Sequence, residues 1–583
     1  MTQPPIEDYA LIGDCRSAAL VSRAGAIDWL CWPRFDSPSV FAALLGTQHH
    51  GRWLIAPREP VLATSRRYVP GTMVLETIFT TASGKIALID FMPPNGDSNH
   101  LVRLVRGIHG SVALDLHLTL RFDYGTAIPW VTRLPEGGIR AVSGPDQVAL
   151  RTKAPLVGKD FATTASFTIA PGETMSFTLS HGASHLPMPA AIDPIAALAE
   201  TEAYWSEWSA RGTYRGRYED AVQRSLITLK ALTYTPTGGM VAAPTTSLPE
   251  AHGGGRNWDY RYCWLRDTAM ALDAFLHSGH FVEAKAWSDW LHRSTAGKPS
   301  DLRIMYGLAG ERRLAEWQAD WLPGYQDAQP VRIGNGAAGQ LQIDVFGEVI
   351  AALSHARHRG LAPSADSWNL QIKVMEHLET IWHLPDEGIW ETRGGRQHFT
   401  FSKLMAWLAF DQTISSAERL SLPAPLSRWR AVRDQIHAEI CTRGFNAARN
   451  SFTQCYDRND LDASLLLLPR SGFLPNDDPR IIGTIDAIVA DLMDGGLVRR
   501  YRAADGLPDH EATFLPCSFW LAEAYARLGR QDAARELFDR LLTLANDVGL
   551  LAEEYDPIQA RHMGNFPQAL THTALIAAAL LIE

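Results

Sequence analysis

The hydrophobic pattern of this chain changes its period once, near residue 190 of 583, and this change constrains the fold more than any other feature. Before it, apolar residues occur in short or alternating runs, which is the pattern of β-strands. After it, apolar residues recur at spacings of three and four, as at Leu521, Ala524 and Leu528, which is the pattern of helices. We therefore predict a β-domain followed by a helical domain.

The first part of the chain consists of short apolar runs separated by turn signals such as Pro135-Glu136-Gly137-Gly138 and Pro171-Gly172. Several short strands with regularly spaced turns are typical of an antiparallel β-sandwich. The runs with strand character are 17–21, 27–30, 73–80, 85–91, 101–108, 113–120, 147–151, 161–169 and 174–180.

The rest of the chain shows one helical pattern over 195–208 and twelve more beyond it. These twelve cover 218–234, 266–279, 281–293, 342–359, 366–383, 401–413, 425–442, 460–468, 479–494, 516–529, 531–547 and 567–581. Taken as consecutive pairs they make six helical hairpins, which can close into an (α/α)6 barrel with a central pocket. An open helical solenoid is the alternative. We predict an N-terminal β-sandwich domain over 1–190, a linker helix over 191–215 and an (α/α)6-barrel catalytic domain over 216–583.

Composition excludes several classes of partner. The chain has 54 Lys and Arg against 64 Asp and Glu and no dense basic run, so we expect no nucleic-acid partner. The N-terminus has no signal-peptide pattern, and the longest late apolar run, 574–582, is shorter than the roughly 20 residues that span a bilayer. We expect a cytoplasmic protein without membrane contact. Oligomeric state stays open, and a homo-oligomer is compatible with the sequence.

None of the known cofactor-binding or metal-binding motifs occurs in the sequence in its required context. Residues 334–339 match GxGxxG, but they lack the βαβ context that a dinucleotide site needs. The chain has no P-loop, HExxH, EF-hand or GxSxG motif. Histidines are dispersed, and we interpret His49, His50 and His572 as surface or packing residues. We therefore expect no cofactor and no metal.

Carboxylates in aromatic, glycine-bearing loops are the best candidates for chemistry. Glu391 follows Trp390 after a turn, and an acid beside an indole in a dry pocket has a raised pKa, as a general acid needs at neutral pH. Glu553 and Glu554 precede Tyr555 in the loop before the last helix. Neighbouring side chains usually point apart, so one of these two would face a pocket as a base that activates water. A solvated acidic loop is the ordinary alternative for both segments.

A third segment, 258–267, combines alternating aromatic rings with a charged pair. In an extended segment alternate side chains share one face. The rings belong to Trp258, Tyr260, Tyr262 and Trp264. Arg266 and Asp267 then open a helix, where they form a donor–acceptor pair suited to the vicinal hydroxyls of a sugar. The helix dipole also favours Asp267 there, which is the structural alternative.

The order of these pieces along the chain is similar to that of glycoside hydrolase family 15, which contains glucoamylases, glucodextranases and bacterial or archaeal trehalases. The pieces that carry the resemblance are 9–15, 28–38, 256–267, 322–325, 330–335, 342–344, 388–391, 513–520, 553–556 and 564–568. The resemblance implies a β-sandwich, a linker helix and an (α/α)6 barrel. It also implies hydrolysis with inversion by two glutamates.

By the same resemblance, individual residues take roles. Glu391 would be the acid and Glu553 the base, although Glu554 stays open for the base. The residues that would bind the sugar are Arg266, Asp267, Trp258, Tyr260, Trp264, Trp317, Trp321, Trp390, Arg500, Glu554 and Tyr555. Arg500 is favoured over the adjacent Arg499, and Trp317 and Trp321 would stack on sugar rings.

The expected function is that of an inverting, exo-acting hydrolase that releases β-glucose from the non-reducing end of a small α-glucoside. Trehalose is slightly favoured, because family members of this kind without an export signal are often trehalases. Malto- or isomalto-oligosaccharides are the alternative, as for a glucoamylase. A non-catalytic sugar-binding protein and a phosphorylase, which would use phosphate in place of the base, are the rivals from other classes.

Overall fold

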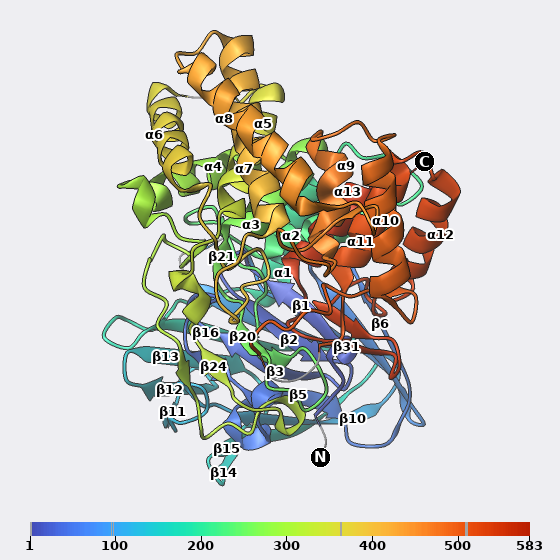
Figure 1. The fold of residues 1–583 in the computed structure, drawn as a ribbon. Coiled ribbons are helices and arrows are strands. Elements are labelled where there is room, and N and C mark those ends of the chain that lie inside the picture. The colour runs from blue at the N-terminus through green and yellow to red at the C-terminus, as the bar shows by residue number, and fades with distance from the viewer. Residues whose placement is uncertain (1–2, 95, 97, 362–363, 508–510, 583) are drawn as a thin grey trace.

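The computed structural model describes residues 3–94, 96, 98–361, 364–507 and 511–582. In this part of the chain, the predicted β-sandwich followed by an (α/α)6 barrel is confirmed (Figure 1). The first eight-stranded antiparallel sheet contains β1 (Tyr9–Gly13), β2 (Ala18–Ser22), β3 (Ala26–Cys31), β4 (Ser39–Phe41), β5 (Arg52–Pro57), β10 (Val112–Thr119), β14 (Val157–Lys159) and β15 (Ala162–Ile169). The second contains β6 (Val61–Tyr68), β7 (Leu75–Thr81), β8 (Gly84–Phe91), β9 (Asn99–Gly110), β11 (Trp130–Arg133), β12 (Ile139–Ser143), β13 (Asp146–Thr152) and β16 (Thr174–Ala183).

Burial explains why some strands have an alternating hydrophobic pattern in the sequence and others form continuous apolar runs. Strand β7 alternates buried and half-buried residues, because only one of its faces meets the core. Strands β1, β2 and β3 are buried along their whole length. Strand β3 contacts the helical domain as well, since the Trp29 indole N–H donates to the Pro244 carbonyl at 2.8 Å. A strand covered on both faces has no polar side to alternate with.

Seven strands of the two large sheets were not predicted, namely β1, β4, β5, β6, β11, β12 and β14. For two of them the reason is exposure at a sheet edge. Strand β11 is exposed at every position and lies at the edge of its sheet, so it has no buried face to mark it. Strand β6, at the other edge, is mostly exposed as well.

The helices form two concentric sets. The outer set contains α2 (Glu219–Ala231), α4 (Phe281–Thr295), α6 (Ala365–Ile381), α8 (Leu426–Glu439), α10 (Pro479–Leu492) and α12 (Gln531–Leu542). The inner set contains α3 (Leu265–His277), α5 (Asp344–His358), α7 (Thr400–Leu420), α9 (Leu468–Ser471), α11 (Leu515–Arg527) and α13 (Ala569–Ala579). Along the inner set, α13 contacts α3, α3 contacts α5 and α5 contacts α7; on the other side, α9 contacts α11 and α11 contacts α13.

One predicted helix differs in form. Residues 460–468 were expected as a regular helix, but the structure has a 3₁₀ helix over Ala463–Leu467 followed by the single turn of α9. The Asp462 carboxylate caps this segment by accepting the Ser464 N–H, and Gly472 ends it with a φ of +70°. Pro469 in the first turn of α9 removes a helical N–H donor, which favours this short, broken element over a long helix.

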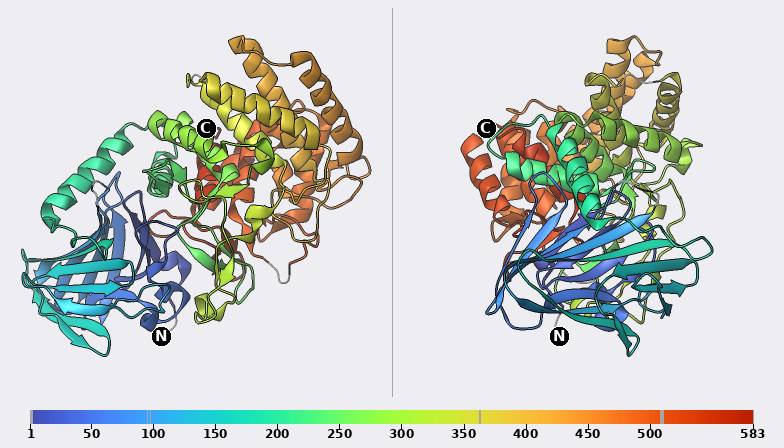
Figure 2. Two further views of the ribbon diagram at one scale, coloured as in Figure 1. Left: turned by 90° about the vertical axis from the view of Figure 1, so that its left-hand side faces the viewer. Right: turned by 180° about the vertical axis from the view of Figure 1, so that it is seen from behind.

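Helix α1 (Pro194–Ala210) connects the two domains and lies beside both of them (Figure 2). It begins where the Asp193 carboxylate accepts the N–H groups of Ile195 and Ala196, with Pro194 at the first helical position. The domains also share side-chain contacts, such as the ion pair between Arg66 of β6 and Asp547. Among the described residues, no helix combines the length and apolar character needed to cross a membrane.

Short hairpins build the long loops between the inner helices. They pair β17 (Thr233–Tyr234) with β18 (Gly239–Met240), β19 (Thr246–Pro249) with β20 (Asn257–Asp259), β21 (Cys263–Trp264) with β22 (Met305–Tyr306), β23 (Trp317–Gln318) with β24 (Arg332–Ile333), β25 (Phe445–Asn446) with β26 (Ser451–Phe452), β27 (Met493–Asp494) with β28 (Leu497–Val498), and β29 (Thr513–Phe514) with β30 (Glu554–Asp556) and β31 (Arg561–Met563). Several of them, including β20, β24 and β31, lie between the helices and the β-sandwich (Figure 1).

Candidate active site

A pocket lies among these loops, at the N-terminal ends of inner helices such as α3 and α11. Six of the predicted site residues line it: Trp258, Tyr260, Arg266, Trp390, Glu391 and Arg500. Further lining comes from Glu250, Arg256, Asn335, Ala337, Ile389, Arg393, Tyr501, Leu507 and Phe514. The pocket therefore combines aromatic faces with several charged groups, as a binding site for a hydroxyl-rich ligand requires.

Glu391 lies in this pocket on a backbone turn with a φ of +59°, which is rare for a residue other than glycine. The turn follows Gly388, whose carbonyl accepts the Glu391 N–H at 3.1 Å. The Trp264 indole N–H donates to Glu391 Oε1 at 2.6 Å. Burial raises the pKa of Glu391, while the Arg266 guanidinium and the Trp264 hydrogen bond oppose that rise. The site therefore favours a carboxyl that holds its proton longer than an exposed one.

Glu553 is fully buried beside the pocket and is held by two donors. The Tyr260 hydroxyl donates to Oε1 at 2.5 Å, and the Asn565 N–H donates to Oε2 at 2.9 Å. Burial and the charge of Glu250 raise the pKa of Glu553, and these two hydrogen bonds oppose the rise. The backbone of Gly564 passes so close that a Cβ there would lie 2.5 Å from Oε2. The carboxylate is thus fixed in both position and orientation.

Three carboxyl groups meet beside Arg500. Oxygens of Glu250, Glu553 and Glu554 lie within 4.8 Å of one another. The Arg500 guanidinium donates to Glu250 Oε2 at 2.8 Å and lies 3.3 Å from Glu554 Oε1. Arg500 therefore places a positive charge beside this cluster and shares that charge with Glu511, with which it also forms an ion pair.

Glu554 differs from its two partners in this cluster. In the described part of the chain, neither of its carboxyl oxygens has a hydrogen-bond partner. Burial and the charge of Glu250 raise the pKa of Glu554 well above its usual range. Glu250, in contrast, also accepts the Trp258 indole N–H at 3.0 Å. The proton that relieves repulsion within the cluster is therefore best placed on Glu554.

The predicted charged pair lies at the start of α3. Arg266 Nε donates to Asp267 Oδ1 at 2.6 Å, and Arg266 Nη1 donates to the Ile389 carbonyl at 2.8 Å. Asp267 itself is buried, and Arg266 lines the pocket. The second hydrogen bond ties α3 to the loop that carries Glu391. The pair thus forms a fixed group of donors and acceptors next to the predicted acid.

The segment from Asn257 to Trp264 connects the two predicted catalytic carboxyls. The rings of Tyr260 and Trp264 pack at a centroid distance of 5.2 Å, and each ring donates to one carboxyl, Tyr260 to Glu553 and Trp264 to Glu391. A continuous chain of contacts therefore runs from one glutamate to the other. Trp258 lies between two guanidinium groups, those of Arg332 at 4.4 Å and Arg393 at 4.7 Å from its ring centroid.

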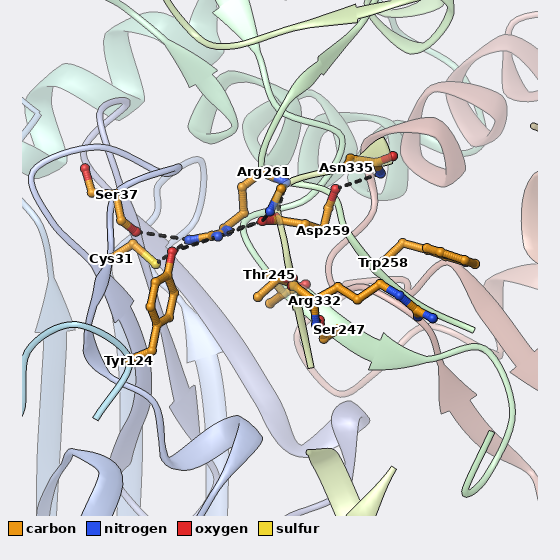
Figure 3. Close-up of polar contacts among 12 residues, drawn as sticks. Cys31, Ser37, Tyr124, Thr245, Ser247, Trp258, Asp259, Arg261, Arg332 and Asn335 are labelled. Carbon is orange, nitrogen blue, oxygen red and sulfur yellow. Dashed lines mark hydrogen bonds and ion pairs between the residues drawn. The ribbon is translucent and has the colours of Figure 1, made fainter. Parts of the chain in front are cut away.

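The intervening residue Arg261 anchors this segment on the β-sandwich, as Figure 3 shows. Its guanidinium pairs with Asp259 at 2.7 Å, and both side chains are fully buried. It also donates to the Ser37 carbonyl at 3.0 Å and to the Tyr124 hydroxyl at 3.0 Å, both in the β-domain. The β-domain therefore contributes directly to the placement of the segment that holds the two glutamates.

Six predicted sugar-binding residues are not part of the pocket lining: Asp267, Trp264 and Glu554, which are buried, and Trp317, Trp321 and Tyr555. Trp317 and Trp321 are 41% and 42% exposed and pack against each other at 5.8 Å. Trp321 donates its indole N–H to the Tyr124 carbonyl. Tyr555 is half-buried and packs edge-on against His562. The predicted binding roles of these six residues stay predictions.

The family model for "Glycosyl hydrolases family 15" matches residues 216–580, well over half of the chain. The chain belongs to this family. A second model, "Trehalase-like, N-terminal", matches residues 1–188. As a member of family 15 the protein is a glycoside hydrolase.

Curated relatives of this family 15 enzyme align over nearly its whole length. A trehalase from Mycolicibacterium smegmatis is 38% identical and covers 99% of this chain and 91% of its own. A trehalase from Thermoplasma acidophilum is 36% identical, with 97% and 98% covered. Among solved structures, a bacterial glucoamylase complexed with acarbose superposes with a TM-score of 0.74 at 14% identity, over 99% of this chain and 95% of that one. The last comparison shows a shared fold.

Sequence reasoning missed some residues of the family 15 pocket, above all Glu250 and Arg256. Both belong to the loop around Gly253-Gly254-Gly255, which has the carboxylate-in-a-glycine-loop pattern that identified Glu391. Arg256 pairs with Asp505 at 2.8 Å. The glycine-loop pattern also applies to Glu250. It was not singled out because no alternating aromatic residues precede it, so the sequence does not distinguish it from an exposed loop glutamate.

Proposed function

We propose that this family 15 enzyme is an inverting, exo-acting α-glucoside hydrolase that cleaves trehalose and releases β-glucose. The observation that carries the proposal is a pair of buried glutamates, one in the pocket and one beside it, each held by its own donors. Burial raises the pKa of both carboxyls. The Trp264 N–H donates to Glu391, whereas Glu553 accepts two hydrogen bonds that favour its ionised form. Two carboxyl groups at one sugar site, one as acid and one as base, are what inversion needs. Curated trehalases at 36–38% identity over almost the whole chain support trehalose as substrate.

In the proposed reaction, Arg266 and Asp267 bind hydroxyl groups of the non-reducing glucose. Glu391 then protonates the glycosidic oxygen as the bond to the anomeric carbon breaks. Glu553 accepts a proton from a water molecule, whose oxygen bonds to the anomeric carbon from the opposite face of the ring. One proton leaves Glu391 and one reaches Glu553, so solvent must exchange both before the next turnover. The products are one β-glucose and the released sugar.

Glu553 is our choice of base over Glu554 because of their hydrogen bonds. An ionised carboxylate needs donors, and Glu553 has the Tyr260 hydroxyl and the Asn565 N–H. Glu554 has Arg500 at 3.3 Å alone, and that guanidinium is shared with Glu250. A neutral Glu554 is close in shape and charge to glutamine. Glu554→Gln should therefore retain far more activity than Glu553→Gln.

The experiment is a substrate panel of trehalose, maltose and isomaltose with the full chain, read by proton NMR during the first turnovers. We expect trehalose to be hydrolysed fastest, with β-glucose from the attacked ring and α-glucose from the leaving ring formed in equal amounts before mutarotation. α-Glucose alone among the first products would contradict inversion, and a preference for maltose would assign a glucoamylase-type substrate. Release of glucose 1-phosphate in phosphate buffer would instead indicate a phosphorylase.

The role of Glu391 as general acid is tested with a substrate whose cleavage needs no acid. Glu391→Gln should lose about 10²–10⁴-fold in kcat on trehalose, the usual contribution of one general acid. On α-glucosyl fluoride, whose leaving group departs without protonation, the loss should be much smaller. Glu553→Gln should lose activity on both substrates. Equal losses by Glu391→Gln on both substrates would argue against its role as the acid.

A further inference from the structure

A second cavity lies inside the barrel, at the opposite end of the inner helices from the pocket with Glu391. It has a volume of about 370 Å³ and is lined by residues of α3, α5, α7, α9 and α11. Asp267 opens α3 at the active site, whereas His277 ends α3 at this cavity. At 1.5 Å per helical residue these two positions are about 15 Å apart. His277 is therefore far from the proposed catalytic centre, although the cavity lining begins at Ala269, two residues after Asp267.

Three side chains with metal-binding groups meet in the wall of this cavity. Asp273 and His277 are four residues apart on α3 and so share one helix face, and His355 faces them from α5. One oxygen of Asp273 and one ring nitrogen of each histidine lie within 4.8 Å of one another. Ligands about 2.0–2.2 Å from a tetrahedral ion are roughly 3.5 Å apart, so small side-chain rotations would complete a site.

The surroundings of Asp273 orient it as a ligand would need. Arg470 of α9 donates to Oδ2 at 2.8 Å, which leaves Oδ1 directed at the two histidines. Oδ1 forms an ion pair with His355 Nδ1 and lies 3.5 Å from His277 Nδ1. Oδ1 is thus paired with His355, and an ion would have to enter between these two atoms. A carboxylate held by one oxygen, with the other directed at imidazoles, is typical of metal sites.

Both histidines already contact their surroundings through ring nitrogens. His277 Nδ1 lies 3.0 Å from the Asp273 carbonyl, and His355 Nε2 accepts from Arg359 Nε at 3.3 Å. An ion bound through Nδ1 of His277 would replace its contact with the backbone. The His277 and His355 rings meet edge to face, with centroids 4.4 Å apart. The cavity beside them leaves room for water as a further ligand. Glu348 also lines it and, with Asp273, balances the positive charge of Arg470.

We propose that Asp273, His277 and His355 form a binding site for a divalent transition-metal ion of the Zn²⁺ type. Imidazole and carboxylate ligands suit Zn²⁺ and Co²⁺, and three protein ligands with an open position are an established zinc arrangement. The ion would connect α3 to α5 at the end of the barrel opposite the pocket. This differs from the sequence-based expectation of no metal, which had no signal for ligands shared between two helices.

The test uses the full chain treated with a chelator and then titrated with ZnSO₄ or CoCl₂ alone. Calorimetry should show one ion bound per chain, and Co²⁺ should give the visible absorption of a tetrahedral site. His355→Gln and Asp273→Asn should each weaken the affinity at least about 100-fold, beyond the 10–100-fold cost of losing a group that only orients a ligand. His185→Gln is the matched control, because His185 is exposed in the segment that follows β16.

A second measurement needs only the wild-type chain. Zn²⁺ should protect His277 and His355 from carbethoxylation by diethyl pyrocarbonate, as read by peptide mass spectrometry, and should leave His185 reactive. The proposal is overturned if the wild type binds no ion, or if Zn²⁺ protects none of the cluster. Equal affinity of the wild type and His355→Gln would also overturn it. Trehalose hydrolysis does not enter these readouts, so they are independent of the proposed function.

Discussion

Replacement of Tyr260 by Phe tests whether the proposed base depends on a single hydrogen bond. The Tyr260 hydroxyl donates to Glu553 Oε1 at 2.5 Å, and its ring is held by the packing against Trp264. Tyr260→Phe removes one oxygen atom and leaves that ring contact. Because the hydrogen bond favours the ionised carboxylate, its loss must raise the pKa of Glu553.

The magnitude follows from the charge on the acceptor. A hydrogen bond to a charged group contributes about 1.5–3 kcal/mol, and one pKa unit corresponds to about 1.4 kcal/mol, so the pKa should rise by about 1–2 units. A base is active when ionised, so activity appears as pH rises through its pKa. The ascending limb of the kcat/KM profile should therefore move about 1–2 units to higher pH. Glu250 and Glu554 titrate together with Glu553, so the ascending limb reports an apparent pKa of the whole cluster.

The assay is kcat/KM for trehalose against pH, with wild type and Tyr260→Phe compared at each point. Below the ascending limb the variant should be about 10–100-fold slower, the factor for a shift of 1–2 units, and it should recover toward wild type at higher pH. Tyr9→Phe is the matched control, since the Tyr9 hydroxyl donates to Asp28 at 2.9 Å within the β-domain. A loss that is uniform across pH, or a limb that stays in place, would refute the reasoning.

Two further substitutions probe the same site. Trp264→Phe removes the hydrogen bond that favours ionised Glu391, so the pKa of this acid should rise by about one unit. Since the acid acts when protonated, the descending limb of the pH profile should move to higher pH. A shift to lower pH would contradict the assignment. Gly564→Ala would place a Cβ 2.5 Å from the Glu553 carboxylate at a φ of +72°, so kcat should fall. The control Gly472→Ala has a similar φ of +70° and no atom within 4 Å of the new Cβ, so it should cost only the roughly 1–2 kcal/mol of backbone strain, measured by denaturant unfolding. Equal activity of the two variants would show that the carboxylate tolerates displacement.

The period of the hydrophobic pattern predicted most of the fold, because burial on one face imposes that period on strands and helices alike. Strand β7 and helix α10 follow it closely. The pattern fails where burial is not one-sided. Strand β1 is covered on both faces, and edge strand β11 on neither. Local propensity alone cannot separate such segments from loops.

The site was predicted in part from chemistry that is visible locally. An acid after a tryptophan in a glycine turn identified Glu391, and the structure places it in the pocket. The roles of Tyr260 and Trp264 could not be read in this way. Their rings were expected to cover a sugar, whereas their polar atoms hold Glu553 and Glu391. Which polar atom meets which carboxylate depends on contacts between residues hundreds of positions apart in the sequence.

Contacts of the segment 257–264 link the helical domain to the β-sandwich. In this segment the rings of Tyr260 and Trp264 reach the two glutamates, while the intervening Arg261 reaches the β-domain. Arg261 is fully buried, and a buried charged group that loses its hydrogen bonds pays the cost of desolvation. Moving the segment away from the sandwich would remove the hydrogen bonds of Arg261 to Ser37 and Tyr124 and is therefore unfavourable. The β-domain thus serves as part of the scaffold that holds the proposed acid and base.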